Sequence, residues 1–201
     1  MTYTLRRYQT FQEYLDAEEL SEERNYRLLS TGEVIELSTE SELNRIITAA
    51  LIAAILKIKG LKFMRHICSG NKDLQVRPVG DKWMNRKPYI MVLTPTHLQE
   101  AKQAIFLEAS APAFVAEIVS PGSTSSESYL RDYVWKRQQY EWWQIPEYWI
   151  IDPHREKVTV LMLVDGTYQE TVFVGESVIR SAVFPAIELT VNGLISGQID
   201  H

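Results

Sequence analysis

The spacing of apolar residues along the chain predicts two substantial helices. Between residues 43 and 58 apolar side chains recur at intervals of three and four, and Thr39 and Glu42 have the T-x-x-E spacing of a capping box. Most other positions in this segment are also apolar, so we expect a core helix that is covered on most sides. Residues 124–143 open with a second capping-box pair and form the second helix, and the polar residues 10–20 predict a short one.

Short apolar runs around these helices predict β-strands. An Asp-Gly pair at 165–166 separates the last two runs and is a strong signal for a hairpin. Because strands both precede and follow the helices, the pattern favours an α/β or α+β fold with one sheet. The predicted strands are two within 26–37 and one each at 62–67, 74–76, 89–93, 113–120, 147–152, 158–164 and 168–174.

The chain predicts a single main domain. Its 201 residues are enough for one ordinary core, and no repeat, low-complexity tract or linker divides them. We assign residues 26–194 to this domain. Residues 1–25 are expected to form a helical or irregular N-terminal extension, and residues 195–201 a C-terminal tail.

Composition narrows the classes of function. With 21 Lys and Arg against 26 Asp and Glu, the net charge is −5, so the chain does not coat nucleic acid non-specifically. Contact with DNA phosphates would need a local basic patch, for which Arg131, Lys136 and Arg137 are the candidates. The lone cysteine, Cys68, excludes an internal disulfide framework and suits a reducing compartment. The sequence shows no signal peptide or membrane-crossing segment, so we expect a cytoplasmic protein with no membrane contact.

An acid interrupts the apolar strand of residues 113–120. Burying Glu117 without a partner is costly, so it lies at an exposed strand end, pairs with a base, or holds a cation. If the following helix packs against this strand, the Lys136 ammonium can reach the Glu117 carboxylate. Alternatively, Lys136 belongs with Arg131 and Arg137 to a solvated basic face.

Several other chemistries lack their sequence signals. The four histidines have no metal-ligand spacing, and no G-x-S-x-G elbow, P-loop or G-x-G-x-x-G occurs. The tryptophan-rich stretch at 135–149 is expected to pack under the turn between helix and strand. Any exposed part of it, together with the apolar helix at 43–58, favours a homodimer.

Four segments, in order along the chain, resemble a known nuclease family. They are RKPYIMVLTP from Arg86, FVAEIVSPGS from Phe114, RDYVWKRQQY from Arg131 and IPEYWIIDP from Ile145. These segments are similar to a restriction-endonuclease family, a prokaryotic branch of the PD-(D/E)XK nuclease superfamily long known as a domain of unknown function. The resemblance runs from about residue 26 to residue 194. It implies a restriction-endonuclease-like fold, which is a central mixed β-sheet flanked by helices.

The resemblance also implies catalytic residues and a cofactor. The two glutamates of the family fall on Glu33 and Glu117, and its lysine, supplied by the following helix, falls on Lys136. The position two residues after the strand glutamate is Val119, which cannot replace that lysine. With Mg²⁺ or Mn²⁺ held by Glu33 and Glu117, these residues would hydrolyse phosphodiester bonds in DNA. We therefore predict that the three side chains converge in one cleft.

Two positions depart from the family pattern. The Pro-Asp pair that supplies the central metal ligand reads Pro88-Tyr89, and a phenol with an ordinary pKa of about 10 is neutral at pH 7 and a poor Mg²⁺ ligand. Asn44 stands where relatives often have histidine at the start of the first long helix. If Tyr89 occupies the aspartate position, its phenol should project into the cleft beside Glu117.

Three functions are therefore open. The first is a metal-dependent DNA endonuclease in which another acid, Asp73 or Asp81, replaces the missing ligand. The second is a catalytically weakened nuclease-fold protein that binds nucleic acid or a protein partner without cutting. The third is an interaction module whose function resides in the dimer.

Overall fold

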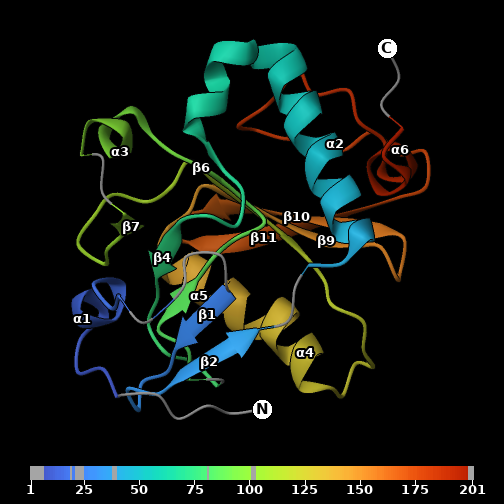
Figure 1. Ribbon diagram of the computed structural model, residues 1–201. Coiled ribbons are helices and arrows are strands. Elements are labelled where there is room, and N and C mark those ends of the chain that lie inside the picture. The colour runs from blue at the N-terminus through green and yellow to red at the C-terminus, as the bar shows by residue number, and fades with distance from the viewer. Residues whose placement is uncertain are drawn as a thin grey trace.

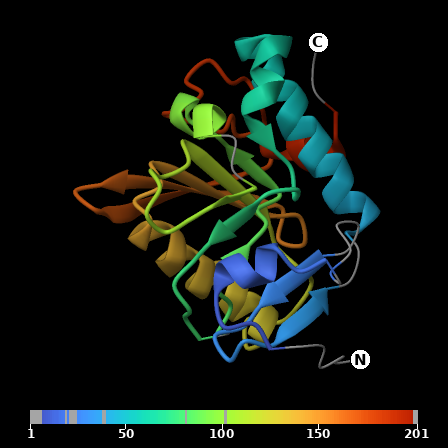
Figure 2. The ribbon, with the colours of Figure 1, turned by 60° about the vertical axis from the view of Figure 1, so that its left-hand side comes forward.

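A central six-stranded mixed sheet with helices on both faces organises the chain (Figure 1, Figure 2). The structure, a computed structural model, describes residues 7–18, 20, 25–37, 40–80, 82–100 and 103–198. The sheet order is β11-β10-β9-β8-β6-β3, in which β8 and β9 pair in parallel and the other neighbours pair antiparallel. The predicted fold class, a mixed sheet flanked by helices, is confirmed.

The strands of the central sheet are β3 (Ile67–Cys68), β6 (Ile90–Val92), β8 (Phe114–Ile118), β9 (Glu147–Asp152), β10 (Lys157–Val164) and β11 (Thr167–Val174). A three-stranded sheet contains β4 (Asp73–Gln75), β5 (Asn85–Arg86) and β7 (Ala104–Ile105), and a two-stranded sheet contains β1 (Asn25–Leu28) and β2 (Val34–Leu37). The predicted hairpin lies between β10 and β11. Asp165 and Gly166 both have positive φ there, as a type I′ turn requires.

The α-helices are α1 (Phe11–Leu15), α2 (Glu42–Lys59), α3 (Pro95–Glu100), α4 (Glu127–Leu130), α5 (Lys136–Trp142) and α6 (Val191–Ser196). A π-helical turn at Arg131–Trp135 joins α4 to α5. Figure 1 shows α2 and α6 on one side of the central sheet and α4 and α5 on the other.

The helix starts differ from the predicted capping boxes. Ser41 caps α2 by accepting a hydrogen bond from the Asn44 backbone N–H at 3.2 Å, whereas Thr39 lies outside the described residues. Likewise Ser126, and not the first residue of the predicted pair, caps α4 and accepts from the Tyr129 N–H. In each case the cap is the hydroxyl residue directly before the first helical residue, since only that position reaches the N–H groups of the first turn.

The strand predicted at 62–67 is wrong. Residues Leu61–His66 form a 3₁₀-helix, and only Ile67 and Cys68 enter the sheet. Gly60, with φ of 80°, ends α2 and turns the chain, after which Leu61 and Met64 are exposed instead of buried. The short helices α3 and α6 were not predicted, because fewer than two turns give no clear helical period.

Two apolar cores lie on the two faces of the sheet. Along β8, Phe114, Ala116 and Ile118 face the core under α2 and α6, whereas Val115 faces the core under α5. This alternation, which every β-strand shows, turns Glu117 toward α5. The pleat therefore decides which helix can supply a partner for that carboxylate.

The N-terminal helix packs on the β1–β2 hairpin. Tyr8, Phe11 and Tyr14 are buried in a third cluster with Tyr26 and Leu28. The boundaries between extension, domain and tail stay a prediction. Among the described helices, none combines the length and apolarity needed to cross a membrane.

A buried carboxylate fastens the C-terminal segment to β9. Glu147 is fully buried, and one oxygen accepts from Trp149 Nε1 at 2.7 Å and Ser181 Oγ at 2.6 Å. The other oxygen accepts from the backbone N–H groups of Ala182 and Val183 at 2.7 and 3.0 Å. This acid of the IPEYWIIDP segment therefore has a structural role that the sequence did not reveal.

Removal of this carboxylate should strongly destabilise the protein. We expect Glu147→Ala to lower the free energy of unfolding by roughly 3 to 5 kcal/mol, because it leaves several buried donors without an acceptor. Urea denaturation followed by circular dichroism measures the change. The exposed Glu188 provides the control, since Glu188→Ala should change stability by less than about 0.5 kcal/mol. Equal effects of the two substitutions would contradict this role for Glu147.

Assembly into a homodimer stays a prediction. The apolar side chains that remain exposed include Ile46 on α2, Trp142 at the end of α5, and Val172 and Val174 on the edge strand β11. Sedimentation equilibrium at high micromolar concentration should give the mass of a dimer. The mass of a monomer under those conditions would contradict the prediction.

Candidate active site

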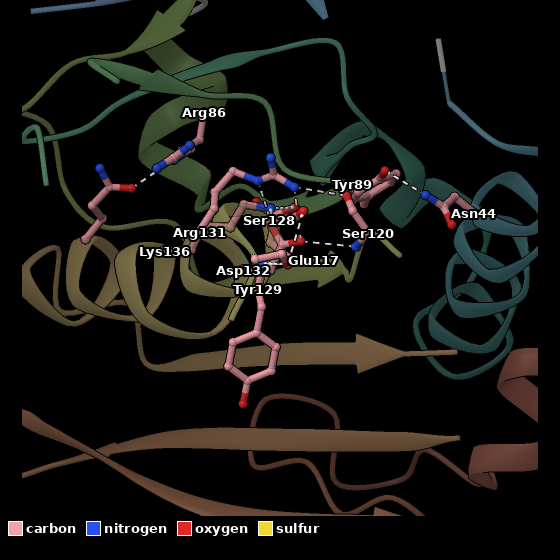
Figure 3. Close-up of polar contacts among 12 residues, drawn as sticks. Asn44, Arg86, Tyr89, Glu117, Ser120, Ser128, Tyr129, Arg131, Asp132 and Lys136 are labelled. Atoms are coloured by element: carbon pink, nitrogen blue, oxygen red, sulfur yellow. Dashed lines mark hydrogen bonds and ion pairs between the residues drawn. The ribbon is translucent and has the colours of Figure 1, made fainter. Parts of the chain in front are cut away.

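Glu117 meets two residues of the helix that covers its face of the sheet. The Lys136 ammonium lies 3.1 Å from Glu117 Oε2, and the Tyr140 hydroxyl donates a 2.6 Å hydrogen bond to Oε1 (Figure 3). Lys136 and Tyr140 are four residues apart on α5, so both point to the same side of the helix. Each oxygen of this buried carboxylate therefore has a protein donor.

A second carboxylate shares the same ammonium. Asp132, one helical turn before Lys136, places Oδ1 at 2.9 Å from the Lys136 nitrogen. Its Oδ2 accepts from the Ser120 backbone N–H at 3.0 Å, and the Arg131 guanidinium contacts the same carboxyl group. Asp132 lies within the π-helical turn and Lys136 directly follows it, and such turns are frequent at functional sites.

Electrostatics keep Asp132 ionised. Burial alone would raise the pKa of Asp132, but the charges of Lys136 and Arg131 and the hydrogen bonds to the carboxylate outweigh it and hold the pKa below its usual value. Asp132 is not among the residues predicted from the sequence. The signal that could have found it is the spacing of an acid four residues before Lys136, which brings opposite charges together on a helix.

Tyr89 lies next to this group of charges. The pairing of Ile90 with Ala116 places Tyr89, just before β6, level with Glu117. Burial and the nearby negative charge of Glu117 raise the pKa of Tyr89 to about 12, so the phenol is neutral at pH 7. Its hydroxyl does not bond to Glu117 but accepts a 2.7 Å hydrogen bond from Asn44 Nδ2 on α2. That Tyr89 occupies the ligand position of the family stays a prediction.

The structure does not bring Glu33 to this group. Its carboxylate accepts hydrogen bonds from Arg7 and from the Thr31 hydroxyl, both at 3.0 Å, and it precedes β2 in the separate two-stranded sheet. Bonds from Thr31 and then Arg7 lower the pKa of this exposed carboxyl group. The predicted convergence is therefore found for Glu117 and Lys136 and not for Glu33, whose hairpin turns it toward other partners.

The suggested replacement acids do not complete a site. Asp73 is bonded to the Asn85 amide and lies 3.6 Å from the Lys87 ammonium. Asp81 lies outside the described residues. Among the described residues, no group of three or more Asp, Glu, His and Cys side chains could hold a metal ion. Because Glu117 and Asp132 are already bonded to protein donors and Tyr89 is neutral, these residues do not fit a resident divalent ion.

Two of the three basic candidates for phosphate contact converge on Asp132, and the third pairs with a different strand. Lys136 is buried between the two carboxylates, and Arg131 bonds to Asp132 and to the Ser120 hydroxyl. Arg137 forms a 2.6 Å ion pair with Glu170 on β11. Lys136 is therefore not part of a solvated face, and a role of the three residues in binding DNA stays a prediction.

The ionised state of Asp132 should make stability depend on pH. A carboxyl group whose pKa is lowered in the folded protein stabilises the folded state at pH values above its unfolded-state pKa of about 3.9. This stabilisation is lost as the pH falls through the pKa of the group in the folded state. We expect Asp132→Asn to cost about 2 to 3 kcal/mol at pH 7 and progressively less below about pH 4.

Urea denaturation from pH 2 to pH 7 measures this difference. Asp165→Asn removes the same charge from an exposed turn and should leave the pH profile unchanged. Parallel profiles for the unaltered protein and the Asp132→Asn variant would contradict the lowered pKa.

Comparisons with known proteins place the chain in a family. The family model described as "Putative restriction endonuclease" matches residues 11–192. A solved structure described as a "putative nuclease belonging to DUF820" from Anabaena variabilis ATCC 29413 has a TM-score of 0.63 and 18% sequence identity, covering 94% of this chain and 99% of that one. At this identity the likeness establishes the fold alone. No curated protein matches the chain. Since the family model spans most of its length, the chain belongs to the "Putative restriction endonuclease" family.

Proposed function

We propose that this chain is a nuclease-fold protein that binds DNA and hydrolyses its phosphodiester bonds only slowly, because its metal site is incomplete. One observation carries the proposal. The Lys136 ammonium is shared by Glu117 and Asp132, while the residue level with Glu117 is a neutral tyrosine. The acid–lysine pair of a phosphodiester hydrolase is thus present without the second ionised ligand that the family pattern implies.

The residues at the site have separable roles in this proposal. Lys136 supplies a positive charge for the negative charge that develops on a phosphoryl group during hydrolysis. Asp132 and Glu117 hold that ammonium in place on the protein, and the Tyr140 hydroxyl fixes the orientation of the Glu117 carboxylate. Family members use a divalent ion, according to the resemblance, and such an ion supplies an activated water and further charge neutralisation when it is bound.

The missing carboxylate explains why metal binding should be weak. At an effective dielectric constant of about 20, a carboxylate about 4 Å from a divalent ion contributes roughly 8 kcal/mol of attraction. Relaxation of the site and water around the ion compensate for part of the lost attraction. The remaining loss still corresponds to orders of magnitude in the affinity for the metal ion. In addition, an ion that approached Glu117 would compete with the Lys136 ammonium for the same oxygens.

Restoring the acid should restore metal binding. We expect Tyr89→Asp to tighten the binding of Mn²⁺ by at least about a hundredfold, because it returns a charged ligand beside Glu117. Tyr89→Asn is the matched control, since it has the same size as the acid and lacks the charge. Calorimetric titration with Mn²⁺ compares the three proteins, and a plasmid-nicking assay follows DNA cleavage.

Different outcomes contradict different parts of the proposal. Equal Mn²⁺ affinity in the Tyr89→Asp and Tyr89→Asn variants would show that Tyr89 is not at a ligand position. Fast nicking by the unaltered protein would show that its site is complete. Failure of the unaltered protein to bind plasmid DNA in a mobility-shift assay would remove the nucleic-acid function and favour an interaction module.

A further inference from the structure

The edge strand β11 presents a long row of backbone groups at one end of the central sheet. It spans eight residues, whereas β3, the strand at the other end of the sheet, spans only two. Figure 2 shows β10 and β11 as a hairpin that extends away from the rest of the fold. Proteins usually protect such an edge with lysine, proline, a bulge or a covering segment, because its free backbone groups pair readily with another strand.

The hairpin turn determines which backbone groups of β11 face away from β10. In a hairpin with a two-residue turn, Val164 and Thr167 form a hydrogen-bonded pair, and the direction of the backbone groups alternates along the strand from there. Every second residue after Thr167 therefore directs its N–H and C=O groups outward. These residues are Tyr168, Glu170, Val172 and Val174.

Side chains of α5 cover the first part of this outer edge. The Tyr168 N–H donates to the Glu141 carboxylate at 2.7 Å, and the Tyr168 C=O accepts from the Arg137 guanidinium at 3.3 Å. Arg137 also forms a 2.6 Å ion pair with the Glu170 side chain. These contacts agree with the outward direction of the Tyr168 backbone, and they close the edge to another strand at this point.

The second part of the outer edge is open. In the described part of the chain, no hydrogen-bond partner contacts the outward N–H and C=O groups of Glu170 and Val172. The Val174 C=O accepts one bond from the Ser177 N–H at 3.0 Å, so one of its two lone pairs is left. The Val172 and Val174 side chains are 50% and 54% exposed. Residues 171–174 are all β-branched or aromatic, so this segment favours pairing with a further strand.

We infer that residues 170–174 of β11 pair with the same residues of a second copy of this chain, antiparallel and about a two-fold axis at Val172. A two-fold axis in the plane of pairing relates strands that run antiparallel. The edge is closed at Tyr168 and the strand ends at Val174, so the register that pairs all the open groups is centred on Val172. Val172 then lies opposite the partner's Val172, and Glu170 lies opposite the partner's Val174. The two central sheets become one continuous sheet.

The side chains of the segment are compatible with this pairing. The exposed valines of the two copies become neighbours on one face of the joined sheet. The two Glu170 residues lie at opposite ends of the pairing, about 14 Å apart along the strands, and each is already paired with an Arg137. A contact built on one strand from each copy is smaller than a standard interface, so we expect a weak dimer that forms at micromolar concentrations.

Sedimentation equilibrium on the full chain tests the interface. Val172→Pro removes the outward N–H at the axis without removing a bond to β10, and proline is tolerated on an edge strand. We expect it to raise the dimer dissociation constant about thirtyfold, because each copy loses one hydrogen bond to the other. Ile46→Ser and Trp142→Ser are the controls. They alter the exposed apolar positions on α2 and α5 and should leave the dissociation constant unchanged.

A cysteine at the axis provides a second measurement. Paired residues in such a register have Cα atoms about 5.5 Å apart, which is within the range of a disulfide, so oxidised Val172→Cys should give a covalent dimer. Gln169→Cys is the matched control, because it is exposed on the same strand but lies about 20 Å from its counterpart in this register. The native Cys68 is buried and does not compete.

Each outcome decides for or against this interface. A monomer at high micromolar concentration would overturn it, as would equal amounts of covalent dimer from Val172→Cys and Gln169→Cys. A dimer that persists in Val172→Pro but dissociates in Ile46→Ser or Trp142→Ser would place the contact elsewhere and would also overturn it. The cysteine measurement decides the question even if Val172→Pro fails to fold. Because neither DNA nor a metal ion enters these measurements, they are independent of the proposed nuclease function.

Discussion

The buried ammonium of Lys136 is the contact on which the candidate site depends. It joins α5 to the central sheet through Glu117, and it joins the helix to itself across the π-helical turn through Asp132. Three charges out of water are tolerated only where the remaining polar atoms also find partners. Tyr140 and the Ser120 backbone N–H supply these partners, so the helix, the sheet and the loop after β8 are tied to one set of side chains.

The other buried acids show what a purely structural carboxylate is like in this fold. Glu147 receives its hydrogen bonds from neutral donors, two of them backbone N–H groups, and no cation in the described part of the chain contacts it. Asp152 accepts from Tyr133 and from backbone N–H groups of the following turn, with Arg155 alongside. Glu117 differs because a lysine is its ionic partner and because a second acid competes for that lysine.

The two positions at which the resemblance predicts a departure from the family pattern contact each other. Asn44 and Tyr89 form a neutral amide–phenol pair between the long helix and the sheet. An aspartate in place of Tyr89 would be too short to reach Asn44 and would be free to follow the pleat toward Glu117. The two residues therefore form one structural unit that links the start of α2 to the start of β6.

The sequence by itself determined the elements whose signal is local. Short apolar runs and the Asp-Gly turn predicted β9, β10 and β11, and the three-to-four spacing of apolar residues predicted α2. Glu117 and Lys136 were also predictable as a pair, because an acid in an apolar strand needs a partner and the next helix carried a cation. Tertiary structure decided the rest. Glu33 could not be placed from sequence, because the orientation of the five-residue turn at 29–33 between β1 and β2 depends on what packs around it. The same holds for three of the four donors to Glu147 and for the direction of Tyr89, which are set by chain segments about 35 and 45 residues away. The local sequence pattern specifies which side chains are buried in the core. Only the assembled fold specifies which buried polar groups become hydrogen-bond or ion-pair partners.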